Sequence, residues 1–190
     1  MPHRFEYEKA HLLDSEQRRK FFPPEKVLGI LEGVRIKRDV AFDIGAGTGY
    51  LTIPLAKIFK KVYAVEISSK MIEILSKKIK ENGILNVGII LSKKPPQVDF
   101  EIDLVVFSNV LHEMDSPEEY LCWAKIADYV LIAEWKKIEM EFGPPIEDRL
   151  SLEDVLSLCR DYEVVKITDL PYHYVALLKK RDRSSRLLSE

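Results

Sequence analysis

The chain has 190 residues, of which 46% are hydrophobic, and its 29 Lys and Arg nearly balance its 31 Asp and Glu, for a net charge of -2. This length suits one domain, and the composition excludes a disordered or fibrous chain. No run approaches the roughly 18 apolar residues of a membrane span, and the balanced charge gives no global field that attracts nucleic acid.

The first ten residues contain acidic side chains and lack the apolar centre of a secretory signal, so we expect a cytoplasmic protein. Charged residues reach 32% while Asn and Gln number only five, a balance typical of thermophilic sources. Two cysteines, Cys122 and Cys159, are too few for a disulfide framework or a zinc site, and we expect no metal. The sequence gives no indication of the oligomeric state.

The first element in chain order is a predicted helical cap over residues 1–38. Its first 22 residues are polar with aromatic interruptions, as in a segment that covers a pocket. Pro23 and Pro24 begin a helix, because proline is well tolerated in a first helical turn. The apolar face of this helix comprises Val27, Ile30, Leu31 and Val34.

From residue 39 to 134 the sequence alternates short β-branched runs with amphipathic stretches, which predicts βα units around a parallel sheet. The stretch from Ser68 to Lys80 has one apolar face and should lie on this sheet. Ser116 and Ser151 each carry an acidic residue three positions later, which predicts two further helix starts. The predicted parallel strands are Val40–Ile44, Val62–Glu66, Val87–Leu91, Asp103–Ser108 and Tyr129–Glu134.

The C-terminal part departs from this alternation. Tyr162–Thr168 and Tyr172–Lys179 are β-rich and separated by only three residues, so they must form an antiparallel hairpin. The sequence therefore predicts a doubly wound, Rossmann-like α/β fold with a seven-stranded, mostly parallel sheet and an antiparallel C-terminal hairpin strand. We expect one domain over residues 1–182, with its α/β core at 39–179 and a flexible tail at 183–190.

The densest chemical pattern is the run Asp43-Ile44-Gly45-Ala46-Gly47-Thr48-Gly49, which follows the first predicted strand. Three glycines at alternate positions allow a sharp turn and bring bare N–H groups against a ligand at the positive end of a helix. Many strand-to-helix turns use glycine for steric reasons alone, so this turn needs a second feature to indicate a site.

Glu66 supplies that feature. It ends the second predicted strand, 23 residues after Asp43. A doubly wound fold places a carboxylate there that accepts hydrogen bonds from both hydroxyls of a ribose. A solvated strand end is the alternative for this glutamate. Together, the turn and the carboxylate predict a nucleoside site at the switch point of the sheet.

The identity of the nucleoside follows from the loop's spacing and charge. The pattern G-x-G-x-G differs from the G-x-G-x-x-G that cradles a pyrophosphate, and Asp43 directly before the loop would repel a diphosphate. The same carboxylate suits a ligand that carries an ammonium and a sulfonium. That ligand is S-adenosylmethionine.

Three segments carry a resemblance to a known family. They are residues 40–57 (VAFDIGAGTGYLTIPLAK), 62–68 (VYAVEIS) and 102–114 (IDLVVFSNVLHEM). These segments are similar to motifs of the class I S-adenosylmethionine-dependent methyltransferases, and they look most like the small menaquinone- and arsenite-methyltransferase branch. The resemblance covers about residues 24–179, and the terminal hairpin matches the reversed seventh strand of the family. Two cysteines argue against arsenic chemistry, because the relatives that perform it use several.

The resemblance implies site residues. The glycine loop would bind the methionine end of the cofactor, Glu66 the ribose, and the residues after the third strand the adenine. At that last position the family often has an acidic residue, whereas this chain has Ser92. The expected cofactor contacts are Asp43, Gly45, Ala46, Gly47, Gly49, Glu66, Ile67, Ser92 and Asn109.

The acceptor side is predicted at residues 108–113, where the fourth strand ends. Methyl transfer from a sulfonium is an in-line displacement in which alignment supplies much of the catalysis, so a base is optional. If one is used, His112 is the candidate, because an imidazole can take a proton near neutral pH. A polar residue in a turn is the alternative for His112. Glu113 and Asp115 are expected to be solvated.

The class of acceptor is inferred from a motif that is missing. The sequence S-N-V-L at residues 108–111 differs from the D/N-P-P-Y/F associated with methylation of amino groups, so we expect a small-molecule acceptor and no nucleic acid. Three alternatives stay open: a cofactor-binding module without catalysis, an RNA methyltransferase and an NAD-dependent oxidoreductase. The loop spacing suits a pyrophosphate poorly, which argues against the oxidoreductase. The lysines recur with glutamates as on a solvated helix, which argues against an RNA-binding face.

Overall fold

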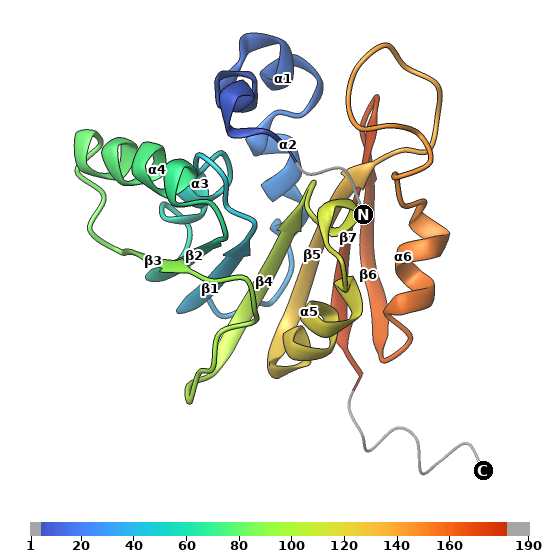
Figure 1. Ribbon diagram of the computed structural model, residues 1–190. Coiled ribbons are helices and arrows are strands. Elements are labelled where there is room, and N and C mark those ends of the chain that lie inside the picture. Colours follow the sequence, from blue (N-terminus) through green and yellow to red (C-terminus); the bar gives the residue numbers. More distant parts are fainter. Residues whose placement is uncertain (1–4, 182–190) are drawn as a thin grey trace.

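The computed structural model describes residues 5–181. At its centre is a seven-stranded sheet in the order β3-β2-β1-β4-β5-β7-β6 (Figure 1). Strands β1 to β5 are parallel, and β7 runs antiparallel to both of its neighbours. The strands are β1 Val40–Ile44, β2 Lys61–Glu66, β3 Val87–Leu91, β4 Ile102–Ser108, β5 Ala127–Trp135, β6 Tyr162–Asp169 and β7 His173–Lys180.

The central strands are buried on both faces, which explains their nearly continuous apolar sequences. In β4, Leu104 and Val106 pack against α2 and α3, whereas Val105 and Phe107 face the layer formed by α5 and α6. Figure 1 shows these helices on opposite sides of the sheet. The helices are α1 Glu16–Phe21, α2 Pro24–Leu28, α3 Thr52–Leu55, α4 Ser69–Glu81, α5 Pro117–Trp123 and α6 Leu152–Leu158, with 3₁₀ turns η1 Tyr7–Asp14, η2 Gly29–Leu31, η3 Leu111–Glu113 and η4 Ala124–Ile126.

The predicted fold class is confirmed. Each predicted strand is present with its ends within two residues of the expected positions. The hairpin of β6 and β7 is joined by residues 170–172, and its pairing runs from Tyr162 opposite Lys180 to Asp169 opposite Tyr174. The expected division into one domain over residues 1–182 stays a prediction, and the expected tail at 183–190 lies outside the described residues.

The helix predicted from Pro23 onward is shorter than its apolar pattern. α2 ends at Leu28 and passes into η2, which ends at Leu31. Gly33 then takes a positive φ of 76°, which breaks the helical path. Val34 therefore lies beyond the helix, although it still packs on the same core.

Serine side chains cap α4 and α6, and the sequence predicts one of these caps, at Ser151. The Ser68 hydroxyl accepts a hydrogen bond from the Met71 N–H at the start of α4. Ser151 and Asp154 form a reciprocal capping box at the start of α6. Ser116 occupies the cap position of α5 without a side-chain hydrogen bond.

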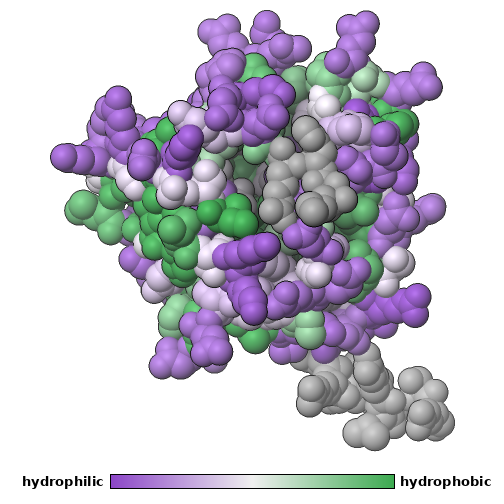
Figure 2. Space-filling model, viewed as in Figure 1, coloured by the Kyte–Doolittle hydropathy of each residue, from purple (hydrophilic) through white to green (hydrophobic). Residues whose placement is uncertain are grey.

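The face shown in Figure 2 is mainly hydrophilic, with apolar side chains gathered over the end of the sheet where β3 lies. β3 is an edge strand, and the side chain of Leu91 at its carboxyl end is 60% exposed. Among residues 5–181, no helix has the length and hydropathy needed to cross a bilayer.

Candidate functional site

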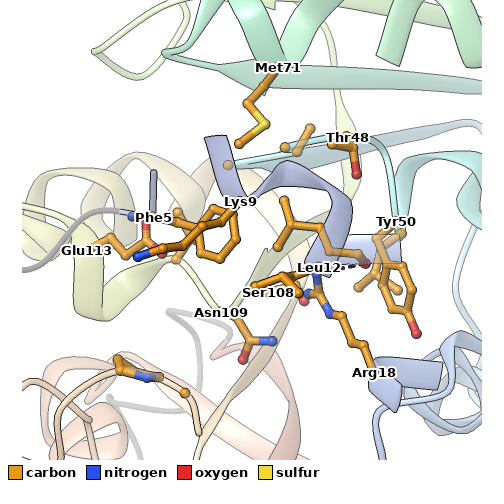
Figure 3. Close-up of a pocket in the computed structure, with 18 of the residues that line it drawn as sticks. Phe5, Lys9, Leu12, Arg18, Thr48, Tyr50, Met71, Ser108, Asn109 and Glu113 are labelled. Carbon is orange, nitrogen blue, oxygen red and sulfur yellow. Dashed lines mark hydrogen bonds between the residues drawn. The ribbon is translucent and has the colours of Figure 1, made fainter. Parts of the chain in front are cut away.

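A cavity of about 650 Å³ lies at the carboxyl edge of the parallel strands. Residues at and after the carboxyl ends of β1, β2 and β4 line it, together with several residues of the N-terminal segment between positions 5 and 21 (Figure 3). We call residues 5–22 the N-terminal cap. The predicted site residues that line this cavity are Asp43, Gly45, Ala46, Gly47, Glu66, Ile67, Asn109 and His112, whereas Gly49 and Ser92 do not line it.

The glycine loop turns as the sequence predicts. Gly45, Gly47 and Gly49 all take positive φ angles, of 71°, 54° and 88°. A Cβ on Gly45 would overlap the side chain of Val110, so this position requires glycine for space as well as for conformation. The loop therefore lies directly against the residues that follow β4.

The amides of this loop are not bare, which differs from the sequence-based expectation. The N–H groups of Gly45 and Ala46 both donate to the carbonyl oxygen of Val65, at 2.9 and 3.1 Å. The Gly47 N–H donates to Glu66 at 2.8 Å. These bonds form because the loop folds back onto the end of β2. The loop amides with partners inside the protein are those of Gly45, Ala46, Gly47 and Gly49.

Glu66 lines the cavity at the end of β2, where the sequence predicts the ribose site. Its side chain is buried and connects the loop to the following turn. Oε2 accepts the hydrogen bond from Gly47, and Oε1 accepts from the N–H groups of Ile67 and Ser68 at 2.8 and 2.9 Å. A carboxylate has about four acceptor positions, so Oε2 keeps one for a ligand hydroxyl.

Asp43 is buried at the end of β1 and also lines the cavity. Its Oδ2 accepts a hydrogen bond from the Thr52 hydroxyl at 2.6 Å. Burial raises the pKa of Asp43 to about 7, and this effect outweighs the hydrogen bond from Thr52 and the positive charge of Arg18. A bound ammonium group would therefore favour ionisation of this carboxyl.

The adenine side of the prediction is only partly matched. Ile67 lines the cavity with a side chain that is 48% exposed, which provides an apolar surface for a flat base. The Ser92 hydroxyl instead donates to the Lys94 carbonyl oxygen at 2.7 Å and accepts from the Lys94 N–H. Its position in this local turn explains why Ser92 lies away from the cavity.

Ser108 and Asn109 present unpartnered polar atoms at the end of β4 (Figure 3). Within residues 5–181, the buried Ser108 hydroxyl and both side-chain polar atoms of Asn109 have no hydrogen-bond partner. Asn109 also has a φ of 53°, which is uncommon for a residue with a side chain. Since leaving buried polar groups unpaired is costly, these atoms indicate a position where a ligand supplies the partners.

His112 lies one turn further along, and Glu134 of β5 holds its ring. Nδ1 lies 2.7 Å from Glu134 Oε2, while Oε1 of the same carboxylate accepts from the Val110 and Leu111 N–H groups. Burial alone would lower the pKa of His112, but the charge and hydrogen bond of Glu134, with the charge of Glu113, raise it. No pattern in the sequence marks Glu134 for this role.

The expectation that Glu113 is solvated is wrong. Only 24% of its side-chain surface is exposed, and it lines the cavity. Its carboxylate accepts a hydrogen bond from the Phe5 N–H at 3.2 Å, so the N-terminal cap covers it. Burial raises the pKa of Glu113. The sequence places it in a short polar turn and carries no indication of the distant segment that buries it.

Arg18 lines the cavity and is not among the residues predicted from the sequence. It extends from α1 of the N-terminal cap, with its guanidinium carbon 4.3 Å from the ring centroid of Tyr50 (Figure 3). The sequence contains 29 basic residues, and nothing in its pattern distinguishes this one. Only the folding of the cap over the glycine loop brings it to the cavity.

Comparisons with known proteins agree with this geometry. A family model described as a methyltransferase domain matches residues 41–130. An S-adenosylmethionine-dependent methyltransferase from Aquifex aeolicus has the same fold with a TM-score of 0.83 and 27% sequence identity, over 94% of this chain and 100% of that one. The chain belongs to the class I S-adenosylmethionine-dependent methyltransferases. The predicted family and its cofactor are therefore confirmed, whereas a cytoplasmic location and a thermophilic source stay predictions.

Curated relatives of this methyltransferase include proteins named for RNA. The probable ribosomal RNA small subunit methyltransferase A of Methanosphaera stadtmanae is 30% identical over 133 residues, which cover 69% of this chain and 47% of the relative. The rRNA adenine N-6-methyltransferase of Escherichia coli is 39% identical over 151 residues, which cover 73% and 60%. The chain spans about half the length of such relatives. The expectation that nucleic acid is not a partner has no support from these names.

Proposed function

We propose that this methyltransferase transfers a methyl group from S-adenosylmethionine to a small-molecule acceptor by in-line displacement. The observation that carries the proposal is a single cavity that contains both Glu66, at the expected ribose position, and the unpartnered polar atoms of Ser108 and Asn109. The cofactor supplies a methyl group on a positively charged sulfur. The protein aligns the acceptor with it, and such orientation contributes about 7 to 11 kcal/mol in favourable cases.

The residues present fit the cofactor. Glu66 keeps an acceptor position for a ribose hydroxyl, and Asp43 provides a carboxyl for the amino group of the methionine end. Ile67 offers an exposed apolar side chain beside Glu66. Asp43 lies at the end of β1 and Glu66 at the end of the neighbouring strand β2. This order suits a ligand that places its amino-acid end at β1 and its nucleoside end at β2.

On the acceptor side, His112 would take the proton that the acceptor releases. Because Nδ1 is bonded to Glu134, the second ring nitrogen, Nε2, is the one available to accept a proton from a hydroxyl, thiol or amine. A raised pKa makes the neutral imidazole a stronger base at any pH above that value. Glu134 fixes the tautomer and the ring orientation.

The N-terminal cap favours a small acceptor. Asp14 accepts a hydrogen bond from Thr48 at 3.0 Å and pairs with Lys78, and the Phe5 N–H donates to Glu113. The cap is thus bonded to opposite sides of the cavity. The cavity volume of about 650 Å³ lies within the range of roughly 300 to 1,000 Å³ typical of small-molecule sites.

RNA is the second candidate acceptor, favoured by the names of the curated relatives. A base of an RNA would have to enter the cavity on its sugar-phosphate chain, which requires the N-terminal cap to move aside. The two candidates therefore differ in whether the cap opens during each turnover.

Cofactor binding is tested by thermal unfolding. S-adenosylhomocysteine at 100 times its dissociation constant should stabilise the protein by about 2.7 kcal/mol. For a chain of this size, the expected rise in Tm is about 5 to 11 °C. NAD at the same concentration is the control and should leave Tm unchanged. No shift with S-adenosylhomocysteine would contradict the proposal for both acceptors.

Acceptor class is tested with a labelled methyl donor. The protein is incubated with a metabolite extract and, separately, with purified ribosomal RNA. Label that enters the metabolite fraction and not the RNA supports the small-molecule proposal. Label that enters the RNA alone contradicts it and favours the second candidate.

A further inference from the structure

Arg18 carries a positive charge into the cavity, and no carboxylate in the part of the chain that the structure describes forms an ion pair with it. Its guanidinium carbon lies over the rings of Tyr50 and Phe22, 4.3 and 5.6 Å from their centroids. Within residues 5–181, its guanidinium makes one hydrogen bond, from NH1 to the Leu13 carbonyl oxygen at 3.1 Å. A guanidinium has five N–H donors, so most of its hydrogen-bonding capacity is left for a ligand.

The surroundings of Arg18 make an anionic ligand favourable. Burial lowers the pKa of Arg18, which shows that its charge is poorly solvated, although Tyr50, Asp14 and Asp43 partly oppose this effect. Asp14 is bonded to Lys78 and Thr48, and Asp43 to Thr52, so neither carboxylate pairs directly with the guanidinium. Arg18 is partly buried, and a cation in such a position without an ion-pair partner is stabilised when an anion reaches it.

The glycine loop does not provide an alternative anion site at its four bonded amides. The N–H groups of Gly45, Ala46, Gly47 and Gly49 already donate to protein acceptors. A ligand carboxylate beside this loop would therefore not be bound by these four amides. Arg18 is the cationic side chain that approaches Tyr50 on the loop, and it lies close enough to Asp43 for their charges to interact.

We propose that Arg18 binds the α-carboxylate of the methionine end of the cofactor, opposite Asp43, which takes the α-ammonium. This inference rests on the proposed function, because it assigns a further contact within the same site. An α-amino acid carries both charged groups on one carbon, and Asp43 and Arg18, which both line the cavity, provide the complementary groups. The planar guanidinium can bond both carboxylate oxygens at once.

With this contact, the N-terminal cap forms part of the cofactor site. Arg18 lies on α1, whereas Asp43 and Glu66 lie at strand ends of the core. A ligand that bridges them joins the cap to the sheet. The amino-acid end of the ligand, and not its nucleoside end, then carries the contact with the cap.

The test compares two ligands that differ only at this end. S-adenosylhomocysteine carries the amino acid, and 5′-methylthioadenosine lacks it. In titration calorimetry, Arg18→Gln should weaken binding of S-adenosylhomocysteine about 10- to 100-fold, as expected for loss of a charge-assisted pair. Binding of 5′-methylthioadenosine should change by less than about twofold on the same scale. Arg18→Lys, which keeps the charge but not the planar fork, should restore part of the affinity.

The matched control is Arg19→Gln, because Arg19 is the exposed neighbour on the same helix and should leave both affinities unchanged. Equal weakening of both ligands by Arg18→Gln would overturn the proposal, since it would indicate a collapsed site. An unchanged affinity for S-adenosylhomocysteine would also overturn it. If the unsubstituted protein binds neither ligand, the proposed function itself fails, and the inference fails with it.

Discussion

The carboxylate of Glu66 has two roles. It accepts hydrogen bonds from three backbone amides, and it lines the cavity where it can bind a ligand. Glu66→Ala should weaken binding of S-adenosylhomocysteine by about 1.5 to 3 kcal/mol, through loss of charge-assisted hydrogen bonds to the ribose. Titration calorimetry measures this change. Glu73→Ala, on the exposed face of α4, is the control. An unchanged affinity in Glu66→Ala would mean that the ribose lies elsewhere.

Asp43 should make cofactor affinity depend on pH. Its raised pKa of about 7 means that the carboxyl is mostly protonated at pH 6 and mostly ionised at pH 8. Only the ionised form attracts the ligand ammonium, so S-adenosylhomocysteine should bind about tenfold more weakly at pH 6 than at pH 8. Calorimetry at the two pH values measures the difference. Asp43→Asn should bind weakly at both, and 5′-methylthioadenosine, which has no ammonium, should show no such dependence.

The site residues that the sequence predicts are those whose place follows from chain order, and the others reach the site through contacts with distant segments. Glu66 follows from chain order, because a strand end at a fixed distance from a glycine turn has one place in a doubly wound sheet. Arg18 and Glu134 have no such marker, since each reaches the site through contacts with segments distant in sequence. Ser92 was expected at the adenine for its position alone, and its hydroxyl instead bonds within its own turn.

At the scale of elements, β5 controls the turn that follows β4. Glu134 accepts hydrogen bonds from Val110, Leu111 and His112 together, so one buried carboxylate fixes both the backbone and the imidazole of η3. The pair also makes stability depend on pH. Because the folded-state pKa of His112 is raised, the pair stabilises the fold below the unfolded pKa, and this contribution is lost as the pH rises through the folded value.

Glu134→Gln should therefore lower the pKa of His112. The substitution keeps the size of the side chain and removes the negative charge that favours the imidazolium. An NMR titration of the His112 ring protons measures the pKa without needing an acceptor. Glu113→Gln is the comparison and should have a smaller effect, because its carboxylate lies 3.8 Å from Nε2 instead of 2.7 Å from Nδ1. A pKa that is the same in Glu134→Gln would show that this carboxylate does not set the protonation of His112.

Strands were easier to predict than helices for a physical reason. Strands β1 and β4 are buried on both faces, so each appears in the sequence as a short apolar run. Polar residues on either side of the run mark its ends. The first three helices are short, and α3 contains only four residues before turns resume. Apolar spacing of three or four residues continues through such turns, as at Val34, because the turns cover the same core.

At the scale of the whole molecule, the N-terminal cap and the sheet meet around one cavity. The cap is bonded to the glycine loop and α4 through Asp14, and to η3 through Phe5. The buried side chain of Phe22 attaches its far end to the core. The end that covers the cavity is thus held by polar contacts, which open more easily than the packed core.

Lys78→Ala should therefore loosen the cap without unfolding the sheet. Lys78 pairs with Asp14 and donates to the Thr48 carbonyl oxygen at 3.0 Å, and both side chains of the pair are at least two-thirds buried. Losing these contacts, partly screened by solvent, should cost about 1 kcal/mol and raise the open population about fivefold. Hydrogen exchange of amides 7–21 measures this opening, while the amides of β1 and β4 should keep their protection.

Lys77→Ala is the matched control, because Lys77 lies next to Lys78 on α4 and its ion pair with Glu81 is exposed. Saturating S-adenosylhomocysteine should restore protection of the cap in Lys78→Ala if Arg18 joins the cap to the ligand's carboxylate. 5′-Methylthioadenosine should restore it less, because it cannot reach Arg18 with a negative charge. Equal exchange in Lys78→Ala and the unsubstituted protein would mean that apolar contacts, and not the Asp14 pair, keep the cap closed.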